Sequence, residues 1–187
     1  MAVIAANRQQ VEVCIGKVGV PLGTLVYVRQ GRREHCAFAY EESWLVNPER
    51  FNVSADLQLT AVHQAHKALS PHDSVFHGAI ADTTPDAWGR RVIARDHAKR
   101  RKADPHLAAL SELDYLLAVD DFSRVGALRL RDQTRGWLRT VPKGRRATPP
   151  LIELERIYNA SRAVEQGQET ADDLRYHRRQ ELMLRTR

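Results

Sequence analysis

Apolar and polar residues alternate with the period of a β-strand through most of the first forty positions. Three such stretches, residues 11–15, 22–29 and 34–40, are separated by short connections that contain glycine. Alternation indicates one buried and one exposed face, and short connections with glycine favour hairpins. The pattern therefore predicts an antiparallel meander of three strands.

The pattern is weaker in the next thirty residues. Residues 41–46 predict a short turn or helix that carries Trp44, and the Asn-Pro pair that follows ends it. Residues 57–60 could form a strand, and residues 61–69 could form a helix that a Ser-Pro pair ends.

A clearer helix is predicted from Pro85 onward. Thr84 is the expected N-cap, Pro85 suits the first helical position, and Asp86 suits the positive end of the helix dipole. The helix should turn an apolar face to the core and a basic face outward. The apolar face holds Trp88, Val92 and Ile93, and the basic face holds Arg90, Arg91, Arg95 and Lys99.

Later segments complete an α+β pattern. Ser111 and Asp114 have the spacing of a capping box, which predicts a short helix over residues 113–119 that Asp120-Asp121 ends. A strand over 125–130, a hairpin partner over 136–141 and helices from Pro150 and near Thr170 follow, and the stripe of the first helix holds Leu151, Leu154, Ile157, Tyr158 and Val164. We expect a small antiparallel β-sheet front subdomain with packed helices, followed by a β-hairpin and C-terminal helices.

Composition is that of an ordinary globular protein, with 43% hydrophobic and 28% charged residues among 187. The chain starts without a cationic segment and apolar run, and no window approaches a membrane-spanning length of apolar residues. A soluble, cytoplasmic protein without a membrane partner is expected. Cys14 and Cys36 form no metal or redox motif, so we expect reduced, half-buried thiols.

The formal charge of +6 raises the question of nucleic acid. The last 13 residues hold five Arg and one Glu, which leaves a net charge of only +2 for the rest of the chain. A second basic run spans residues 90–102. A solvated helix face is favoured for that run over phosphate binding, because no aromatic residues interleave with it.

Two groups of residues suggest chemistry. His63 and His66, together with His72 and His77, have spacing that zinc ligands use, but neither a cysteine pair nor an acidic third ligand accompanies them. Structural or surface histidines are the favoured interpretation. A second group, Asp82 and Asp86, could act as an acid–base pair, although helix capping explains Asp86 more simply.

Two blocks of sequence resemble the front end of HipA-like serine/threonine kinases, the toxins of bacterial toxin–antitoxin pairs. The resemblance spans about residues 11–172, and Gly23-Thr24-Leu25 and Trp44 are similar too. The first block holds Phe76, Gly78, Asp82, Pro85, Asp86, Trp88, Gly89, Arg90 and Arg91. The second holds Leu110, Asp114, Tyr115, Leu116, Leu117, Asp120, Ser123, Arg124, Val125, Gly126, Ala127 and Leu128.

The resemblance implies a front subdomain packed against a kinase core that uses ATP and magnesium. The family's phosphate loop should follow residues 165–174, where this chain has the Arg-rich segment 175–187 without glycine. We therefore expect that the chain lacks the kinase core, as a frameshift or truncation would produce, and we assign no catalytic, cofactor-binding or metal residue. The expected parts are a front subdomain over 1–132, a hairpin and helix over 133–174, and an aberrant tail over 175–187 that does not pack.

The resemblance also implies partners. The first hypothesis is a protein-interaction module that contacts a kinase core, in cis or in trans, and a helix-turn-helix antitoxin, and that meets DNA only through the antitoxin. The motif residues of both blocks are its candidate interface. Alternatives are a free-standing inhibitor of a separate HipA-like kinase, a weak DNA-associated protein, and an intact small kinase. For a full-length relative, the family implies phosphorylation of a protein, typically an aminoacyl-tRNA synthetase.

Overall fold

The computed structural model describes residues 7–66, 68, 70, 73–119, 121, 124–132, 136–137, 154–170 and 174. The chain forms two compact units. The sheet unit comprises residues 1–84 and 125–138, and the helical unit comprises residues 85–124 and 139–187. The predicted divisions at residues 132 and 174 stay predictions.

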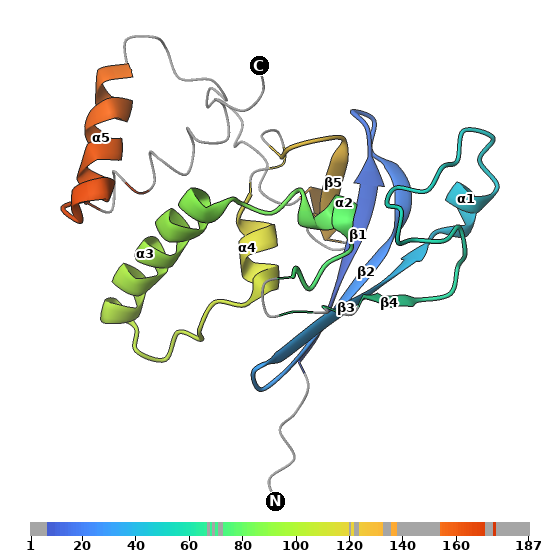
Figure 1. The fold of residues 1–187 in the computed structure, drawn as a ribbon, viewed down its shortest axis with the longest axis horizontal. Coiled ribbons are helices and arrows are strands. Elements are labelled where there is room, and N and C mark those ends of the chain that lie inside the picture. The colour runs from blue at the N-terminus through green and yellow to red at the C-terminus, as the bar shows by residue number, and fades with distance from the viewer. Residues whose placement is uncertain are drawn as a thin grey trace, which may run out of the picture. The chain divides into compact units, whose positions relative to one another are not determined.

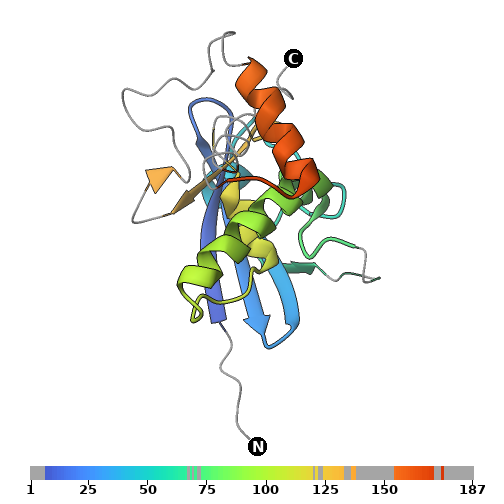
Figure 2. The same cartoon turned by 90° about the vertical axis from the view of Figure 1, so that its left-hand side faces the viewer.

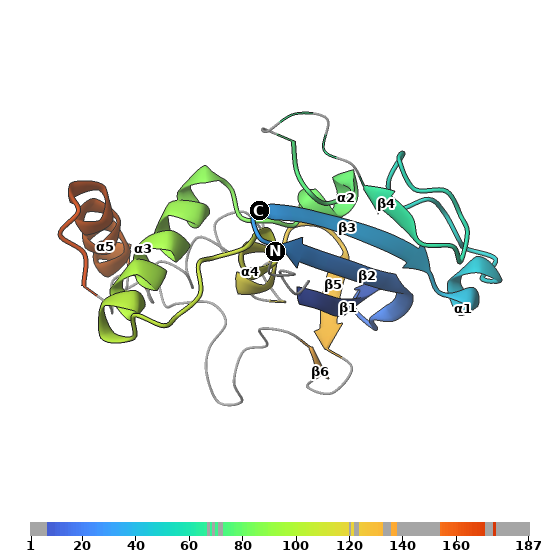
Figure 3. The same cartoon turned by 90° about the horizontal axis from the view of Figure 1, so that it is seen from below.

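The sheet unit is built on one antiparallel sheet of six strands in the order β4-β3-β2-β1-β5-β6 (Figures 1 and 3). The strands are β1 (Asn7–Ile15), β2 (Val20–Gln30), β3 (Arg33–Tyr40), β4 (Gln64–His66), β5 (Leu128–Asp132) and β6 (Gly136–Trp137). Two one-turn helices, α1 (Glu42–Leu45) and α2 (Gly78–Ala81), belong to the same unit. The predicted meander is confirmed as β1, β2 and β3.

Close approach of neighbouring strands requires glycine at one position of the meander. A Cβ at Gly23 in β2 would lie 2.3 Å from the carbonyl oxygen of Ala39 and 2.4 Å from Cζ of Phe38. Any larger residue would have to displace β3 or the Phe38 ring. The Gly23 of the family pattern is therefore a packing residue.

The prediction for residues 57–69 was wrong. Residues 57–60 form no strand, and in place of the predicted helix over 61–69 the described residues 61–66 contain β4, which pairs with β3 through Cys36 opposite His66. The side-chain amide of Gln64 accepts from the backbone N–H of Gln58 and donates to the Gln58 carbonyl, both at 2.8 Å. The edge of β3 supplies β4 with backbone hydrogen bonds, whereas a short helix without tertiary contacts is marginal in water.

One face of the central strands carries a large part of the core of the sheet unit. Tyr27, Cys36 and His66 are opposite one another across β2, β3 and β4, and paired residues of antiparallel strands point to the same face. Phe76, from the segment before α2, packs against Tyr27 with ring centroids 6.3 Å apart. The fully buried large side chains of the unit are Tyr27, Phe38, Phe76, Leu22, Leu25, Leu57, Leu130 and Val13.

Both cysteines are free and fully buried, more deeply than expected. Burial raises the pKa of Cys14 to about 11 and that of Cys36 to about 12, so both thiols stay protonated at neutral pH. We predict that neither thiol reacts with Ellman's reagent at pH 8 in the folded protein, and that both react after unfolding in urea. Rapid reaction of either thiol in the folded protein would contradict the packing around it.

The helical unit contains α3 (Ala87–Ala103), α4 (Glu112–Ala118) and α5 (Leu154–Gln166) (Figure 2). Val92 of α3, Val164 of α5 and Leu174 form a buried cluster, against which Trp88 packs. The stripe predicted for the helix from Pro150 is confirmed at Val164, which is buried, and is wrong at Tyr158, which is 64% exposed. The side chains of Leu151, Leu154 and Ile157, the other members of this stripe, lie outside the described residues.

The α+β class is confirmed, and no kinase core is evident in the part of the chain that the structure describes. Within that part, no helix is long and apolar enough to cross a membrane. The tail over 175–187 lies outside the described residues, as do Asp120 and Ser123 of the second motif block and His72.

Candidate functional site

The first motif block begins in the sheet unit with a buried aromatic residue. Phe76 is 1% exposed and belongs to the core. Gly78 opens α2, and a Cβ there would lie 3.1 Å from Oγ of Ser54, so glycine lets the loop that carries Ser54 approach. Asp82 is the exposed C-cap residue of α2. Phe76 and Gly78 thus support the fold at this point.

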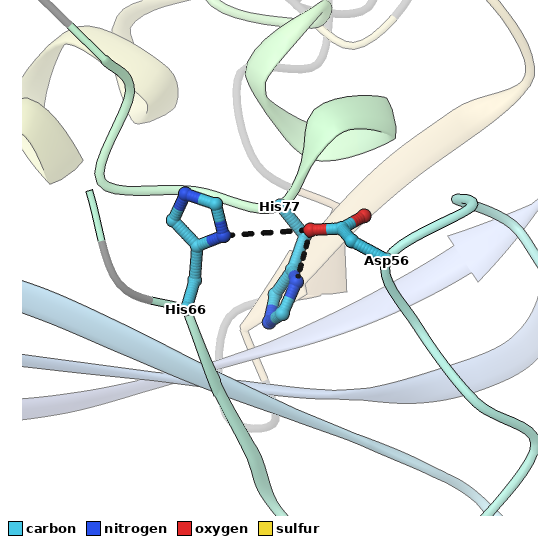
Figure 4. A group of neighbouring side chains, drawn as sticks. All are labelled: Asp56, His66 and His77. Carbon is cyan, nitrogen blue, oxygen red and sulfur yellow. Dashed lines mark hydrogen bonds and ion pairs between the residues drawn. The ribbon is translucent and has the colours of Figure 1, made fainter. Parts of the chain in front are cut away.

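Asp56, His66 and His77 converge beside these residues (Figure 4). Oδ2 of Asp56 lies 2.7 Å from Nδ1 of His77 and 3.4 Å from Nδ1 of His66. The two imidazole rings meet edge to face, with centroids 4.9 Å apart. Three separate segments supply these side chains: the loop after α1, strand β4, and the residue before α2.

Further hydrogen bonds fix the orientation of all three side chains. Nε2 of His77 lies 3.0 Å from the Gln64 carbonyl oxygen, and Nε2 of His66 lies 3.1 Å from that of Ser74. The Ser54 hydroxyl donates to Oδ1 of Asp56 and accepts from the backbone N–H of Ala79. Burial would raise the pKa of Asp56, but hydrogen bonds from Ser54 and His77 and the charge of His77 outweigh it and lower that pKa to about 2.

Sequence reasoning found only part of this cluster. It named His66 and His77, but also His63, which is exposed in the loop before β4. The interpretation that no acidic residue accompanies the histidines is wrong, because Asp56 binds both. No signal could have found Asp56, since it lies in a loop without periodicity, ten residues before His66.

The first motif block continues at the start of α3, in the helical unit. The N-cap is Asp86, whose carboxylate accepts from the backbone N–H of Gly89 at 2.9 Å. The prediction of Thr84 as N-cap was therefore wrong, and Pro85 lies outside the helix. A carboxylate satisfies an unpaired N–H and complements the helix dipole, whereas the Thr84 hydroxyl donates to the Ala81 carbonyl.

Arg90 joins α3 to α4 within the helical unit. Its guanidinium donates to both carboxylate oxygens of Glu112, at 2.9 and 2.7 Å, and lies 4.7 Å from the centre of the Tyr115 ring. The hydrogen bond to Glu112 raises the pKa of Arg90 against the opposing effect of burial. Arg91 is exposed, with its guanidinium 5.4 Å from the centre of the Trp88 ring.

The second motif block caps both ends of α4. At the N-terminal end, Ser111 and Asp114 form the predicted capping box, which is confirmed. At the C-terminal end, the buried guanidinium of Arg124 donates to the carbonyl oxygens of Leu116 and Val119, at 3.2 and 3.0 Å. Carbonyls at a helix C-terminus have no partner within the helix, so Arg124 supplies one.

The end of this block returns to the sheet unit. Gly126 and Ala127 are exposed, and Gly126 has a φ of 83°. The Ala127 carbonyl accepts from the backbone N–H of Gly16 at 2.9 Å, which aligns β5 with the end of β1. The predicted strand over 125–130 is thereby shifted to begin at Leu128, because Gly126 bends the chain.

Comparison with protein-family models gave one decisive match. Residues 13–132, well over half of the chain, match the model of the HipA N-terminal domain. The chain belongs to this family. A comparison with curated proteins found no match.

The match to the HipA N-terminal domain contains the whole of both motif blocks and the Asp56–His66–His77 cluster. It also crosses both compact units, because residues 85–124 belong to the helical unit. Within the HipA N-terminal domain of this chain, Phe76, Asp86, Arg90 and Arg124 stabilise local structure. Their use as an interface stays a prediction.

Most of the basic residues of α3 in this HipA N-terminal domain have partners. Arg95 and Lys99 both pair with Glu169, at 3.3 and 3.6 Å, and donate to carbonyl oxygens at and just beyond the C-terminal end of α5. Arg100 pairs with Asp96 at 3.3 Å. The expectation of a basic face turned outward fails for Arg95 and Lys99, because their charge complements the negative end of the α5 dipole.

Proposed function

We propose that this chain is a protein-interaction module of a HipA-like toxin system. In this proposal, it contacts a HipA-like serine/threonine kinase core, in cis or in trans, and a helix-turn-helix antitoxin. The match of residues 13–132 to the HipA N-terminal domain is the observation that carries the proposal. The whole assembly would use ATP and magnesium through the kinase core, in the cytoplasm.

The roles of the polar motif residues support a binding module. Asp86 and Asp114 cap helices, Arg90 joins two helices, and Arg124 holds the end of one. Each of these groups is engaged within the fold, so the motif preserves a shape. A preserved shape suits a domain whose task is to present a surface to other proteins.

The same contacts make direct DNA binding the weaker alternative. Cations that neutralise phosphates must be available, and Arg90, Arg95 and Lys99 are engaged with carboxylates in the helical unit. Contact with operator DNA in our proposal is therefore indirect, through the antitoxin. Weak binding that falls steeply with salt is the behaviour expected of any residual contact.

The proposal is tested with three purified proteins: this chain, a HipA-like kinase core produced without its own N-terminal domain, and a helix-turn-helix antitoxin of the same system. Size-exclusion chromatography with light scattering should show a complex of the chain with each partner, and the chain alone should transfer no phosphate from magnesium-ATP. Loss of kinase activity on complex formation would assign the chain the role of an inhibitor in trans. Separate elution from both partners would overturn the proposal.

A further inference from the structure

We propose that Asp56, His66 and His77 form a binding site for a divalent transition metal ion, with Zn²⁺ as the preferred occupant. The site lies in the sheet unit, and its geometry does not depend on whether the proposed kinase and antitoxin contacts exist. It rests on the convergence of two imidazole Nδ1 atoms on one carboxylate oxygen.

The positions of the hydrogens on the two imidazole rings follow from their hydrogen-bond partners. A backbone carbonyl oxygen can only accept, so the Nε2 atoms that face Gln64 and Ser74 carry the hydrogens. In a neutral imidazole the other nitrogen then has a lone pair and no hydrogen. With both rings neutral, both lone pairs would point to Oδ2 of Asp56, at 2.7 and 3.4 Å, and that oxygen is itself an acceptor.

Protons alone do not satisfy the three acceptors of this site. With no metal bound, a proton on His77 makes its contact with Asp56 a hydrogen bond, but the lone pair of a neutral His66 still faces the same oxygen. Protonating both rings would place two cations, with centroids 4.9 Å apart, against one carboxylate, and His77 is only 2% exposed. One metal ion would satisfy all three acceptors at once.

Hydrogen bonds from the surrounding chain orient all three ligands. Histidines that bind metals almost always donate the other ring N–H to a carbonyl, carboxylate or water, which fixes the ring and its tautomer. His66 and His77 both have this support. The Ser54 hydroxyl holds the remaining oxygen of Asp56, and the Ala79 N–H holds Ser54 in turn.

The spacing and the types of the ligand atoms favour Zn²⁺. Ligand atoms about 2.0–2.2 Å from a tetrahedral Zn²⁺ are separated from one another by roughly 3.4 Å. The Asp56–His66 separation of 3.4 Å matches this value, and the Asp56–His77 separation of 2.7 Å must lengthen. Two nitrogen ligands and one carboxylate suit zinc and its neighbours better than magnesium or calcium, which prefer all-oxygen sites.

Three protein ligands leave at least one coordination position for water or an incoming group. The Asp56 side chain is 40% exposed, so an ion can enter from solvent on that side. The ion would also cross-link three segments of the sheet unit, which are the loop after α1, strand β4 and the start of α2. Because a ligand that binds only the folded state stabilises it, metal loading should raise the melting temperature.

The test uses the full chain without an affinity tag, stripped of metal with EDTA. Titration with ZnCl₂ in a calorimeter should show one saturable site per chain, and Co²⁺ should give visible absorption bands that Zn²⁺ abolishes. Asp56→Asn and His66→Ala should weaken Zn²⁺ binding by at least roughly 10–100-fold, the loss that even supporting residues cause. His63→Ala removes an exposed histidine nearby and is the matched control, with unchanged affinity.

Absence of saturable Zn²⁺ and Co²⁺ binding to the folded wild-type chain would overturn the proposal. The three side chains would then be joined by hydrogen bonds alone. Equal loss of affinity in His63→Ala, or none in His66→Ala, would overturn it as well, because the ion would then be bound elsewhere. Circular dichroism shows which variants fold. The wild-type stoichiometry and its rise in melting temperature decide the matter even where a variant does not fold.

Discussion

Replacing Phe76 with alanine should cost the protein about 3–5 kcal/mol in free energy of unfolding, the usual loss for a fully buried phenylalanine. Phe76 is 1% exposed and packs against Tyr27, so alanine would leave a cavity between the sheet and the segment before α2. Urea unfolding followed by circular dichroism measures the loss. Phe76→Leu, which refills most of the volume, should cost much less.

Phe51→Ala is the matched control for this substitution. The Phe51 side chain is half exposed and makes one edge-to-face contact with Trp44, at 5.5 Å between centroids. Its loss should cost about 1 kcal/mol. If Phe76→Ala proved no worse than Phe51→Ala, the assignment of this motif residue to the core would be wrong, and an interface role would be favoured.

Replacing Arg124 with alanine should destabilise the helical unit by roughly 2–4 kcal/mol, because hydrogen bonds from a charged donor are lost and buried acceptors are left unsatisfied. Arg124 is 5% exposed and holds the carbonyls of Leu116 and Val119 at the end of α4. Arg124→Lys should recover only part of the loss, since an ammonium group cannot reproduce the fork of a guanidinium. The far-ultraviolet signal during urea unfolding reports the change.

Arg101→Ala provides the comparison, because Arg101 is an exposed arginine in the last turn of α3. Its removal should change the free energy of unfolding by no more than about 0.5 kcal/mol. A small effect of Arg124→Ala, equal to that of Arg101→Ala, would mean that water or another donor caps α4 as well as Arg124 does.

The strands of the meander were predictable because each carries its own signal. β1, β2 and β3 alternate in polarity and are joined by short turns, so their assignment needs no knowledge of the rest of the fold. β4 has only three residues and exists because the edge of β3 is available to it. Pairing of this kind depends on tertiary structure and leaves no local pattern in a segment that also suits a helix.

Helix ends were partly predictable for a similar reason. The capping box of α4 joins residues three positions apart, so spacing alone revealed it. At α3, Thr84 and Asp86 were both acceptable caps, and the choice was settled by the partner that each side chain found. The buried role of Arg124 could not be foreseen, because a charged residue in a loop is normally exposed.

The candidate metal site shows the same limit. His66 and His77 are near each other in sequence, but Asp56 joins them only because a loop folds back over β4. No motif with fixed spacing describes a site built from three separate segments. Its detection requires the directions of the ring nitrogens and the hydrogen bonds around them.

In our proposal, this HipA N-terminal domain binds an antitoxin of its own system. The most direct measurement is calorimetric titration of the folded chain with a helix-turn-helix antitoxin of that system. We predict a saturable isotherm with a defined stoichiometry. The isotherm should be the same in the presence and in the absence of DNA. Absence of heat with both proteins folded and at about 100 μM, where even weak complexes form, would contradict the claim.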